Sequence, residues 1–234
     1  MQVKNETAVV VGVGPGLGSA LVNIFAKQGY SVFAAARGES APDAPASSTG
    51  EIIRVKCDAT DPAQVEDLFS KAERHGPLRV AVFNAGVFQK ANVVETDPAE
   101  FERCWRVGCF GGFLVGRAAA KAMLKHGAGT ILFTGATASL RGAAGFANLA
   151  SPKFALRAVA QSLARELGPK GIHVAHAIID GQIHSRRYAH LADERGPDSL
   201  LDPTAIAEAY LALHRQPRSA WTQELDLRPW VEKF

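Results

Sequence analysis

The segment Val9–Gly18 constrains the fold of this chain more than any other stretch. A run of valines ends at Gly12, and a helical pattern of apolar residues begins at Leu17. This pattern predicts a buried strand, a tight turn and the start of a helix. Glycines in the turn leave backbone N–H groups uncovered, and the helix N-terminus behind them carries partial positive charge. The segment therefore suits the diphosphate of a dinucleotide.

The glycines of this turn are spaced G-x-x-x-G-x-G, through Gly12, Gly16 and Gly18, and not G-x-G-x-x-G as in the commonest dinucleotide fingerprint. A glycine-rich connector that binds nothing is the alternative interpretation of a lone motif. Its position after a strand and before a helix favours nucleotide binding. The expected cofactor contacts in this turn are Gly12, Gly14, Pro15, Gly16 and Leu17.

Length and composition indicate one soluble α/β domain spanning residues 1–234, since 47% of the residues are hydrophobic and 21% are charged. The net charge of +3 comes without a basic block, which argues against a nucleic-acid partner. The N-terminus lacks an apolar signal core and no apolar run approaches membrane-spanning length, so no membrane partner is expected. The three cysteines have neither metal-ligand nor disulfide spacing. We therefore expect no metal site, and we expect the protein to lie in the reducing cytoplasm.

Strand and helix patterns alternate along the whole chain. Such alternation implies parallel β-α-β units with right-handed crossovers, hence a doubly wound sheet with helices on both faces. Strands are predicted at 6–11, 31–36, 51–57, 79–84, 129–135, 172–179 and 220–226, and helices at 16–28, 62–75, 98–124, 151–168 and 203–214.

Gly38–Gly50 departs from this rhythm, because Pro, Ser and Ala dominate where a crossover helix is expected. A flap over the adenosine end of a cofactor and a tolerated surface loop are both consistent with that composition, and we favour the surface loop.

The predicted helices 98–124 and 151–168 are apolar or small on most sides. A helix that is hydrophobic all round is buried on both faces. One face would meet the sheet and the other would meet a second copy of the chain, so we expect a homodimer or homotetramer. The C-terminal residues 230–234 are expected to pack against the body of the protein or against a neighbouring subunit.

A set of further motifs follows the glycine turn in a fixed order. Cys57-Asp58 and Asn84-Ala85-Gly86 each close a strand, Lys153 lies inside an Ala/Leu-rich helix, and Gly181 follows the strand ending at Ile179. In this order and spacing the chain resembles the short-chain dehydrogenase/reductase family over nearly its full length. The resemblance implies a seven-stranded, mainly parallel Rossmann-type sheet, with a nicotinamide dinucleotide at the carboxyl ends of the strands.

The resemblance also implies roles for individual residues. Asp58, with Ala59 beside it, would contact the adenine, and Asn84, Ala85 and Gly86 would line the adenine ribose. Lys153 would hold the nicotinamide ribose, and Gly181 with Ile183 would contact the nicotinamide. The family usually has Pro-Gly after the late strand, whereas this chain has Asp180-Gly181.

Arg37 is the residue that indicates whether the cofactor is NAD or NADP. It lies just beyond the predicted strand Ser31–Ala36, where folds specific for NAD usually place a carboxylate. Ala36 supplies no carboxylate, and a guanidinium grips a phosphate with two parallel hydrogen bonds. A solvated surface arginine is the alternative interpretation. The missing acid and the present base together favour NADP(H).

The proton-transfer residues that the resemblance implies are largely missing. The family's reaction is hydride transfer between nicotinamide and a carbonyl or alcohol, assisted by Asn, Ser, Tyr and Lys. Lys153 is present, but the Tyr position holds Leu149, the Ser position holds Ala136 and the Asn position holds Gly108. A placed general acid or base is typically worth about 10²–10⁴ in rate, so reduction of an unactivated ketone should be severely impaired.

Three hypotheses follow from the intact cofactor motifs and the lost tetrad. The first, and the favoured one, is an NADP(H)-dependent oxidoreductase with rearranged proton delivery. The second is a non-redox enzyme on the same scaffold, and the third is a cofactor-binding regulatory protein without turnover. Lys153 would serve as acid or as ribose clamp, and we favour the clamp. Candidate substitutes for the lost groups are Thr137, Ser139, His184, Tyr188 and His190, although the first two suit a turn and the others a polar lid over the substrate at 184–199.

Overall fold

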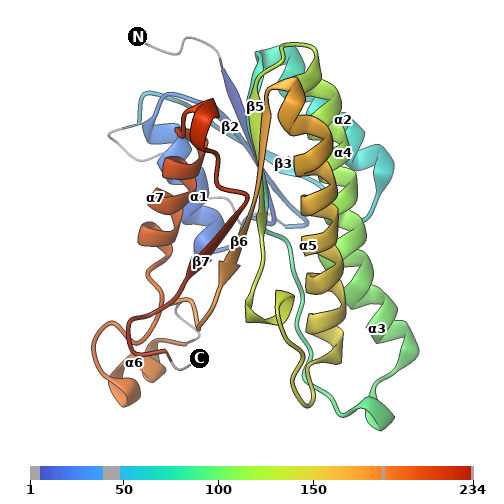
Figure 1. Ribbon diagram of the computed structural model, residues 1–234, viewed down its shortest axis with the longest axis vertical. Helices are drawn as coiled ribbons and strands as arrows, with labels where there is room; N and C mark the ends of the chain where they lie inside the picture. The colour runs from blue at the N-terminus through green and yellow to red at the C-terminus, as the bar shows by residue number, and fades with distance from the viewer. Residues whose placement is uncertain (1–5, 39–47, 186–187, 233–234) are drawn as a thin grey trace.

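Parallel strands joined by helical crossovers build the molecule, which is a computed structural model that describes residues 6–38, 48–185 and 188–232 (Figure 1). The strands form one seven-stranded, wholly parallel sheet in the order β3-β2-β1-β4-β5-β6-β7. The predicted doubly wound, Rossmann-type α/β fold is therefore confirmed. The strands are β1 (Thr7–Val11), β2 (Ser31–Ala36), β3 (Ile52–Lys56), β4 (Leu78–Phe83), β5 (Gly129–Thr134), β6 (Ile172–Ile179) and β7 (Glu224–Leu227).

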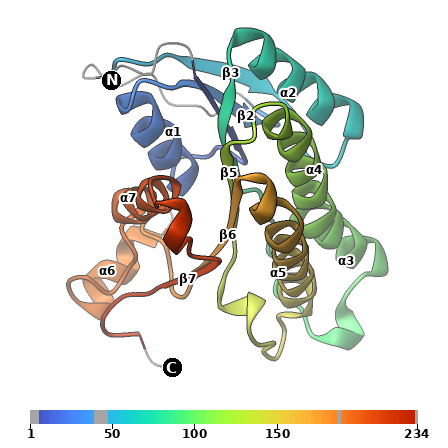
Figure 2. The same ribbon diagram turned by 45° about the horizontal axis from the view of Figure 1, so that its top comes forward.

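Helices cover both faces of this sheet (Figures 1 and 2). The helices α1 and α7 lie on one face, and α2, α4 and α5 lie on the other. The helices are α1 (Leu17–Lys27), α2 (Pro62–His75), α3 (Pro98–Trp105), α4 (Gly111–Leu124), α5 (Ala147–Leu167), α6 (Ala189–Arg195) and α7 (Pro203–His214).

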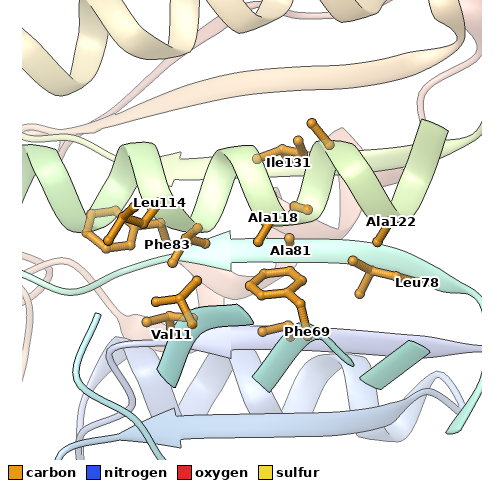
Figure 3. Packing of buried hydrophobic residues seen from close by; sticks show 14 of the residues in the cluster. Val11, Phe69, Leu78, Ala81, Phe83, Leu114, Ala118, Ala122 and Ile131 are labelled. Atoms are coloured by element: carbon orange, nitrogen blue, oxygen red, sulfur yellow. The ribbon is translucent and has the colours of Figure 1, made fainter. Parts of the chain in front are cut away.

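Each central strand contributes side chains to two hydrophobic cores, because successive side chains point to opposite faces of a sheet. In β1, Val9 and Val11 join the core under α2, α4 and α5, whereas Ala8 and Val10 join the core under α1 and α7. Figure 3 shows the first core, where Leu114 and Ala118 of α4 face the strand residues. Burial on both faces explains why these strands read as continuous apolar runs.

The strand order reverses between β1 and β4. The chain runs outward from β1 through β2 to β3 and then returns to β4 on the other side of β1. In open α/β sheets, ligands bind at the carboxyl ends of the strands beside such a reversal, because the neighbouring connections leave in opposite directions there. The fold therefore places a binding crevice next to the glycine turn after β1.

Three elements differ from the sequence prediction by more than one residue. The helix predicted at 98–124 is broken into α3 and α4 by a π-helical segment, Arg106–Phe110. Helix α5 begins at Ala147 rather than 151, because Pro152 lies inside the helix although proline usually marks a first turn. β7 begins at Glu224 rather than 220, because Gln216 binds the backbone N–H and the hydroxyl of Thr222 and holds that approach as a loop. The short helix α6 was not predicted.

Several large apolar side chains on α3, α4 and α5 stay uncovered in the single chain. Trp105, Phe113 and Phe154 are 39%, 42% and 43% exposed. The expectation that these helices are buried on both faces is therefore not met within one chain, and burial by a second copy stays a prediction. Trp230 is 81% exposed, so the prediction that it packs against the body of its own chain is wrong. Packing of this residue against a neighbouring subunit stays a prediction.

One helical stretch, Pro98–Leu124, is long and apolar enough by length and composition to cross a membrane, which the sequence analysis did not anticipate. Of its most apolar window, 67% is buried inside the protein, as in the core helix of a soluble fold. Residues 39–47 of the predicted surface loop lie outside the described residues, as do 186–187 of the predicted lid.

Candidate functional site

The turn after β1 passes directly over the end of β4. Gly12 has φ +92°, and a Cβ there would lie 2.3 Å from the backbone nitrogen of Ala85. Only glycine fits this contact, because a side chain would overlap the backbone of the neighbouring strand end. The Asn84 amide donates to the Gly12 carbonyl over 3.0 Å and ties the two segments together.

Gly14 and Gly16 have a different role. A Cβ at either position would meet nothing within 4 Å, so the packing of the protein does not require glycine there. Helix α1 begins at Leu17 without a side-chain cap. The first N–H groups of a helix have no partner within the helix, so this end offers donors and partial positive charge to an anion. An open, uncapped turn of this kind fits the diphosphate of a dinucleotide.

Residues that the sequence predicted as cofactor contacts meet in one cavity of about 210 Å³ at this edge of the sheet. The residues are drawn from the ends of β1, β2, β3 and β4. The predicted ones that line it are Gly12, Arg37, Asp58, Ala59, Asn84, Ala85 and Gly86, and those that sequence reasoning missed are Val11, Val13, Ala36, Cys57, Thr60 and Val107. The missed residues are mostly apolar and carry no pattern that separates them from the core.

Asp58 is oriented by its own loop. Its Oδ1 accepts from the Thr60 backbone N–H and hydroxyl over 2.9 and 2.8 Å. Burial, with the neighbouring Asp58 charge, raises the pKa of the Cys57 thiol to about 11. Cys57 therefore stays neutral near pH 7 and is no nucleophile. Arg37 is exposed and lines the same cavity.

Lys153 projects from α5 to the carboxyl ends of β4 and β5. Its ammonium donates to the Thr134 carbonyl over 2.6 Å and lies 3.9 Å from where a Cβ on Gly86 would be. The residue is only 7% exposed, and this burial lowers the pKa of its ammonium to about 8. Lys153 therefore lies beside the Asn84–Gly86 segment, and its predicted contact with the nicotinamide ribose stays a prediction.

The three positions that the family resemblance pairs with Lys153 hold residues without a side-chain hydrogen-bond donor. Leu149 lies one turn earlier on the same helix, and residues four apart share a helix face. Ala136 ends the approach from β5, and its backbone N–H donates to Ser139 over 3.2 Å. At Gly108 a Cβ would lie 2.8 Å from Cβ of Pro152, so the proline ring fills the space that a side chain would need.

The carboxyl end of β6 carries polar contacts that the sequence analysis did not foresee. The Thr137 hydroxyl donates to Asp180, and the Arg228 guanidinium lies 3.4 Å from the same carboxylate. Gly181 has φ +145°, and a Cβ there would lie 2.8 Å from Pro229. Ile183 pairs with Leu201 through an isolated bridge. The departure Asp180-Gly181 was visible in sequence, but its partner Thr137 lies 43 residues away.

The other candidate polar groups are placed less favourably. Ser139 is fully buried, and its hydroxyl lies 3.4 Å from His176, which is itself buried. This pair braces the turn at Ala136 from inside and does not reach solvent. His184 and His190 are exposed, His184 before α6 and His190 within it. Among the described residues no group of His, Cys, Asp and Glu side chains suits a metal ion.

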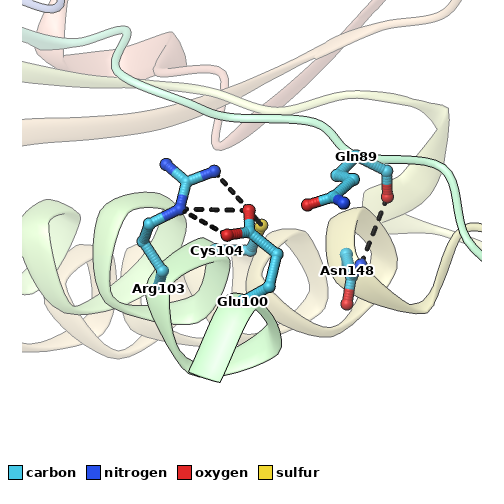
Figure 4. A network of polar contacts seen from close by, with 5 residues as sticks. All are labelled: Gln89, Glu100, Arg103, Cys104 and Asn148. Atoms are coloured by element: carbon cyan, nitrogen blue, oxygen red, sulfur yellow. Dashed lines mark hydrogen bonds and ion pairs between the residues drawn. The ribbon is translucent and has the colours of Figure 1, made fainter. Parts of the chain in front are cut away.

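Where α3 meets the start of α5, further polar contacts fix the outer edge of the site (Figure 4). Asn148 donates to the Gln89 carbonyl over 3.3 Å and ties the first turn of α5 to the loop after β4. On α3, Arg103 pairs with Glu100, and the Cys104 thiol donates to the same carboxylate over 3.7 Å. The Asn148 contact thereby anchors the loop after β4 to the turn of α5 that carries Leu149.

Comparison with known proteins gives a consistent result. The family model described as short chain dehydrogenase matches residues 6–194. The chain is 31% identical over 192 residues to the 3-oxoacyl-[acyl-carrier-protein] reductase MabA of Mycobacterium avium, covering 82% of this chain and 72% of the relative. A crystal structure of a short-chain dehydrogenase from Rhodopseudomonas palustris is 40% identical, with a TM-score of 0.82, and 97% and 100% of the two chains are covered. The structure of ElxO with NADP bound shares the fold at 20% identity, with a TM-score of 0.82 over 96% and 98% of the chains.

The buried ammonium of Lys153 predicts a measurable effect of pH on stability. Its pKa is lowered in the folded state, so the unfolded chain binds the additional proton between about pH 8 and the ordinary lysine value. Unfolding free energy of the wild type should therefore rise relative to that of Lys153→Met as pH increases from 8 to 10.5. Chemical denaturation across this range measures the difference, with Lys121→Met on the exposed side of α4 as control. A pH-independent difference would contradict the assignment.

Proposed function

Since the chain belongs to the short-chain dehydrogenase family, we propose that it is an NADP(H)-dependent oxidoreductase acting on a small-molecule substrate. The observation that carries this proposal is the meeting of Gly12, Arg37, Asp58 and Asn84 in one cavity at the reversal of strand order. Ligands of open α/β sheets bind at that place. When bound, the nicotinamide supplies or accepts a hydride.

The residues of this chain divide the work of holding the cofactor. The uncapped start of α1, with Gly14, Pro15, Gly16 and Leu17, would receive the diphosphate. Asp58 and Ala59 would contact the adenine, and Asn84, Ala85 and Gly86 its ribose. Lys153 would clamp the nicotinamide ribose, because its ammonium already reaches the strand ends. Gly181 and Ile183 would border the nicotinamide.

NADP(H) rather than NAD(H) is proposed from Arg37. Arg37 and Ala36 both line the cavity, and Ala36 carries no carboxylate to receive a ribose hydroxyl, which supports this choice. A guanidinium binds a phosphate through paired, charge-assisted hydrogen bonds. The phosphate on the adenine ribose of NADP(H) is the group that distinguishes the two cofactors and would face Arg37.

The Arg37 assignment predicts cofactor preference. NADPH should bind at least about tenfold more tightly than NADH, because one charge-assisted contact contributes roughly 1.5–3 kcal/mol. Arg37→Ala should weaken NADPH and leave NADH unchanged, as measured by fluorescence titration. Arg117→Ala, on the exposed surface of α4, is the matched control. Equal affinity of the wild type for both cofactors would overturn the assignment.

Ordinary ketones are proposed to be poor substrates, since Ala136, Leu149 and Gly108 offer no donor to a substrate oxygen. Cofactor binding without redox turnover is the second candidate function, and the same three positions favour it. A non-redox reaction on the same scaffold is the third. Turnover of any substrate with NADPH separates the first candidate from the other two.

Restoring two of the missing groups should raise ketone reduction. The double variant Leu149→Tyr with Ala136→Ser places a phenol one turn from Lys153, whose charge lowers the pKa of the phenol. Steady-state assays on a simple ketone should show a gain for the double variant larger than the product of the single gains, because catalytic groups act as a unit. Substantial ketone turnover by the wild type, insensitive to Lys153→Met, would show that other residues deliver the proton.

Assembly with a second copy is proposed from the uncovered side chains of α3, α4 and α5. Light scattering at micromolar concentration should find a homodimer or homotetramer. Phe113→Lys together with Phe154→Glu should shift it to smaller species, since both side chains are more than two-fifths exposed in the single chain. A monomeric wild type would contradict the proposal.

A cytoplasmic location is proposed from the cysteines. All three are free and buried, which supports a reducing compartment.

A further inference from the structure

The carboxyl ends of β5 and β6 carry an acceptor site rather than a donor site. β5 and β6 are neighbours, and the Gly135 N–H donates to the Ala177 carbonyl over 2.7 Å where they end. Just beyond, Thr137 donates its hydroxyl proton to the Asp180 carboxylate. A threonine whose proton is committed in this way presents only lone pairs to a further ligand. Thr137 therefore suits a ligand that donates a hydrogen bond.

Asp180 supplies a buried carboxylate to this site. It is only 6% exposed, and among the described residues it shares the Arg228 guanidinium with Asp226. Little water screens a carboxylate at this depth, so its attraction for a cation is stronger than at the surface.

The same region offers few donors to a developing alkoxide. Ala136 and Leu149 carry no donor side chain, and the backbone N–H of Ala136 is already bound to Ser139. Lys153 commits one of its three N–H donors to the Thr134 carbonyl. A carbonyl that takes up a hydride becomes an alkoxide and needs a proton or an oxyanion-binding donor, so these positions favour that step less than side chains with donors would.

We propose that the substrate is a cyclic or open-chain iminium ion, whose N–H is received by the Thr137–Asp180 pair. The proposal rests on the NADP(H)-dependent oxidoreductase function. The iminium carbon gains a C–H bond with the two electrons of the hydride from the reduced nicotinamide. The C=N π pair becomes the nitrogen lone pair, so the cation becomes a neutral amine and no proton is transferred in the step. The absent phenol and hydroxyl are then not needed.

The first test compares an imine with a ketone of the same ring size. NADPH oxidation should be at least about 100-fold faster with 2-methyl-1-pyrroline than with cyclopentanone, the factor that a missing general acid costs the ketone. Asp180→Asn and Thr137→Val should each slow the imine reaction about tenfold or more, since a charge-assisted contact is lost. Asp67→Asn, the same chemical change on the exposed side of α2, should leave it unchanged.

The second test measures binding without turnover. Calorimetry of the NADP⁺ complex should detect pyrrolidinium but not the neutral cyclopentanol, and Asp180→Asn should lose pyrrolidinium while keeping NADP⁺. Asparagine retains an acceptor for Thr137, so the variant removes charge with little change of shape. A wild type that does not bind NADP⁺ would overturn the proposed function itself.

With NADP⁺ binding intact, three results would overturn the iminium proposal alone. Cyclopentanone turnover as fast as that of the imine is the first. Pyrrolidinium affinity unchanged in Asp180→Asn is the second. The third is a wild type that neither reduces the imine nor binds pyrrolidinium.

Discussion

The close approach of Gly12 to Ala85 is the contact on which the whole binding edge depends. It lets the turn after β1 cross the end of β4, and the Asn84 amide fastens the crossing. Because β1 lies inside the sheet, between β2 and β4, fixing this turn also fixes the start of α1 relative to the loops after β2 and β3. Arg37 and Asp58 then face one cavity although they belong to different connections. A substitution at position 12 would disturb every one of these placements.

The site has two electrostatic halves that the backbone keeps apart. On the β1 side, an uncapped helix start and Arg37 present positive charge and N–H donors, which suit phosphates. On the β6 side, Asp180 and Thr137 present acceptors. Lys153 lies at the end of β5, between the two halves, and burial lowers the pKa of its ammonium to about 8. In the proposed function, the first half would hold the cofactor and the second would hold the substrate.

The positions of strands and helices were predicted well because the residues that determine them are close together in the sequence. Valine runs mark buried strands, and Asp61 and Asp202 cap α2 and α7, so both helices begin where the pattern indicates. The strand ends then predicted most of the cavity lining. The Thr137–Asp180 contact was not predictable, since it joins two loops through tertiary structure alone. The start of α5 was missed for a related reason, because packing keeps Pro152 inside a helix against its usual preference.

The contact between Pro152 and Gly108 has a consequence for how this protein can change. The Pro152 ring occupies the space that a side chain at position 108 would need, so the residue allowed at 108 depends on the residue at 152. A lone replacement at 108 meets the pyrrolidine ring, whereas loss of the ring first opens a void beside the π-helical segment. A polar side chain at position 108 therefore requires that Pro152 be replaced first. The order of steps, and not only their number, separates this chain from one with a side chain there.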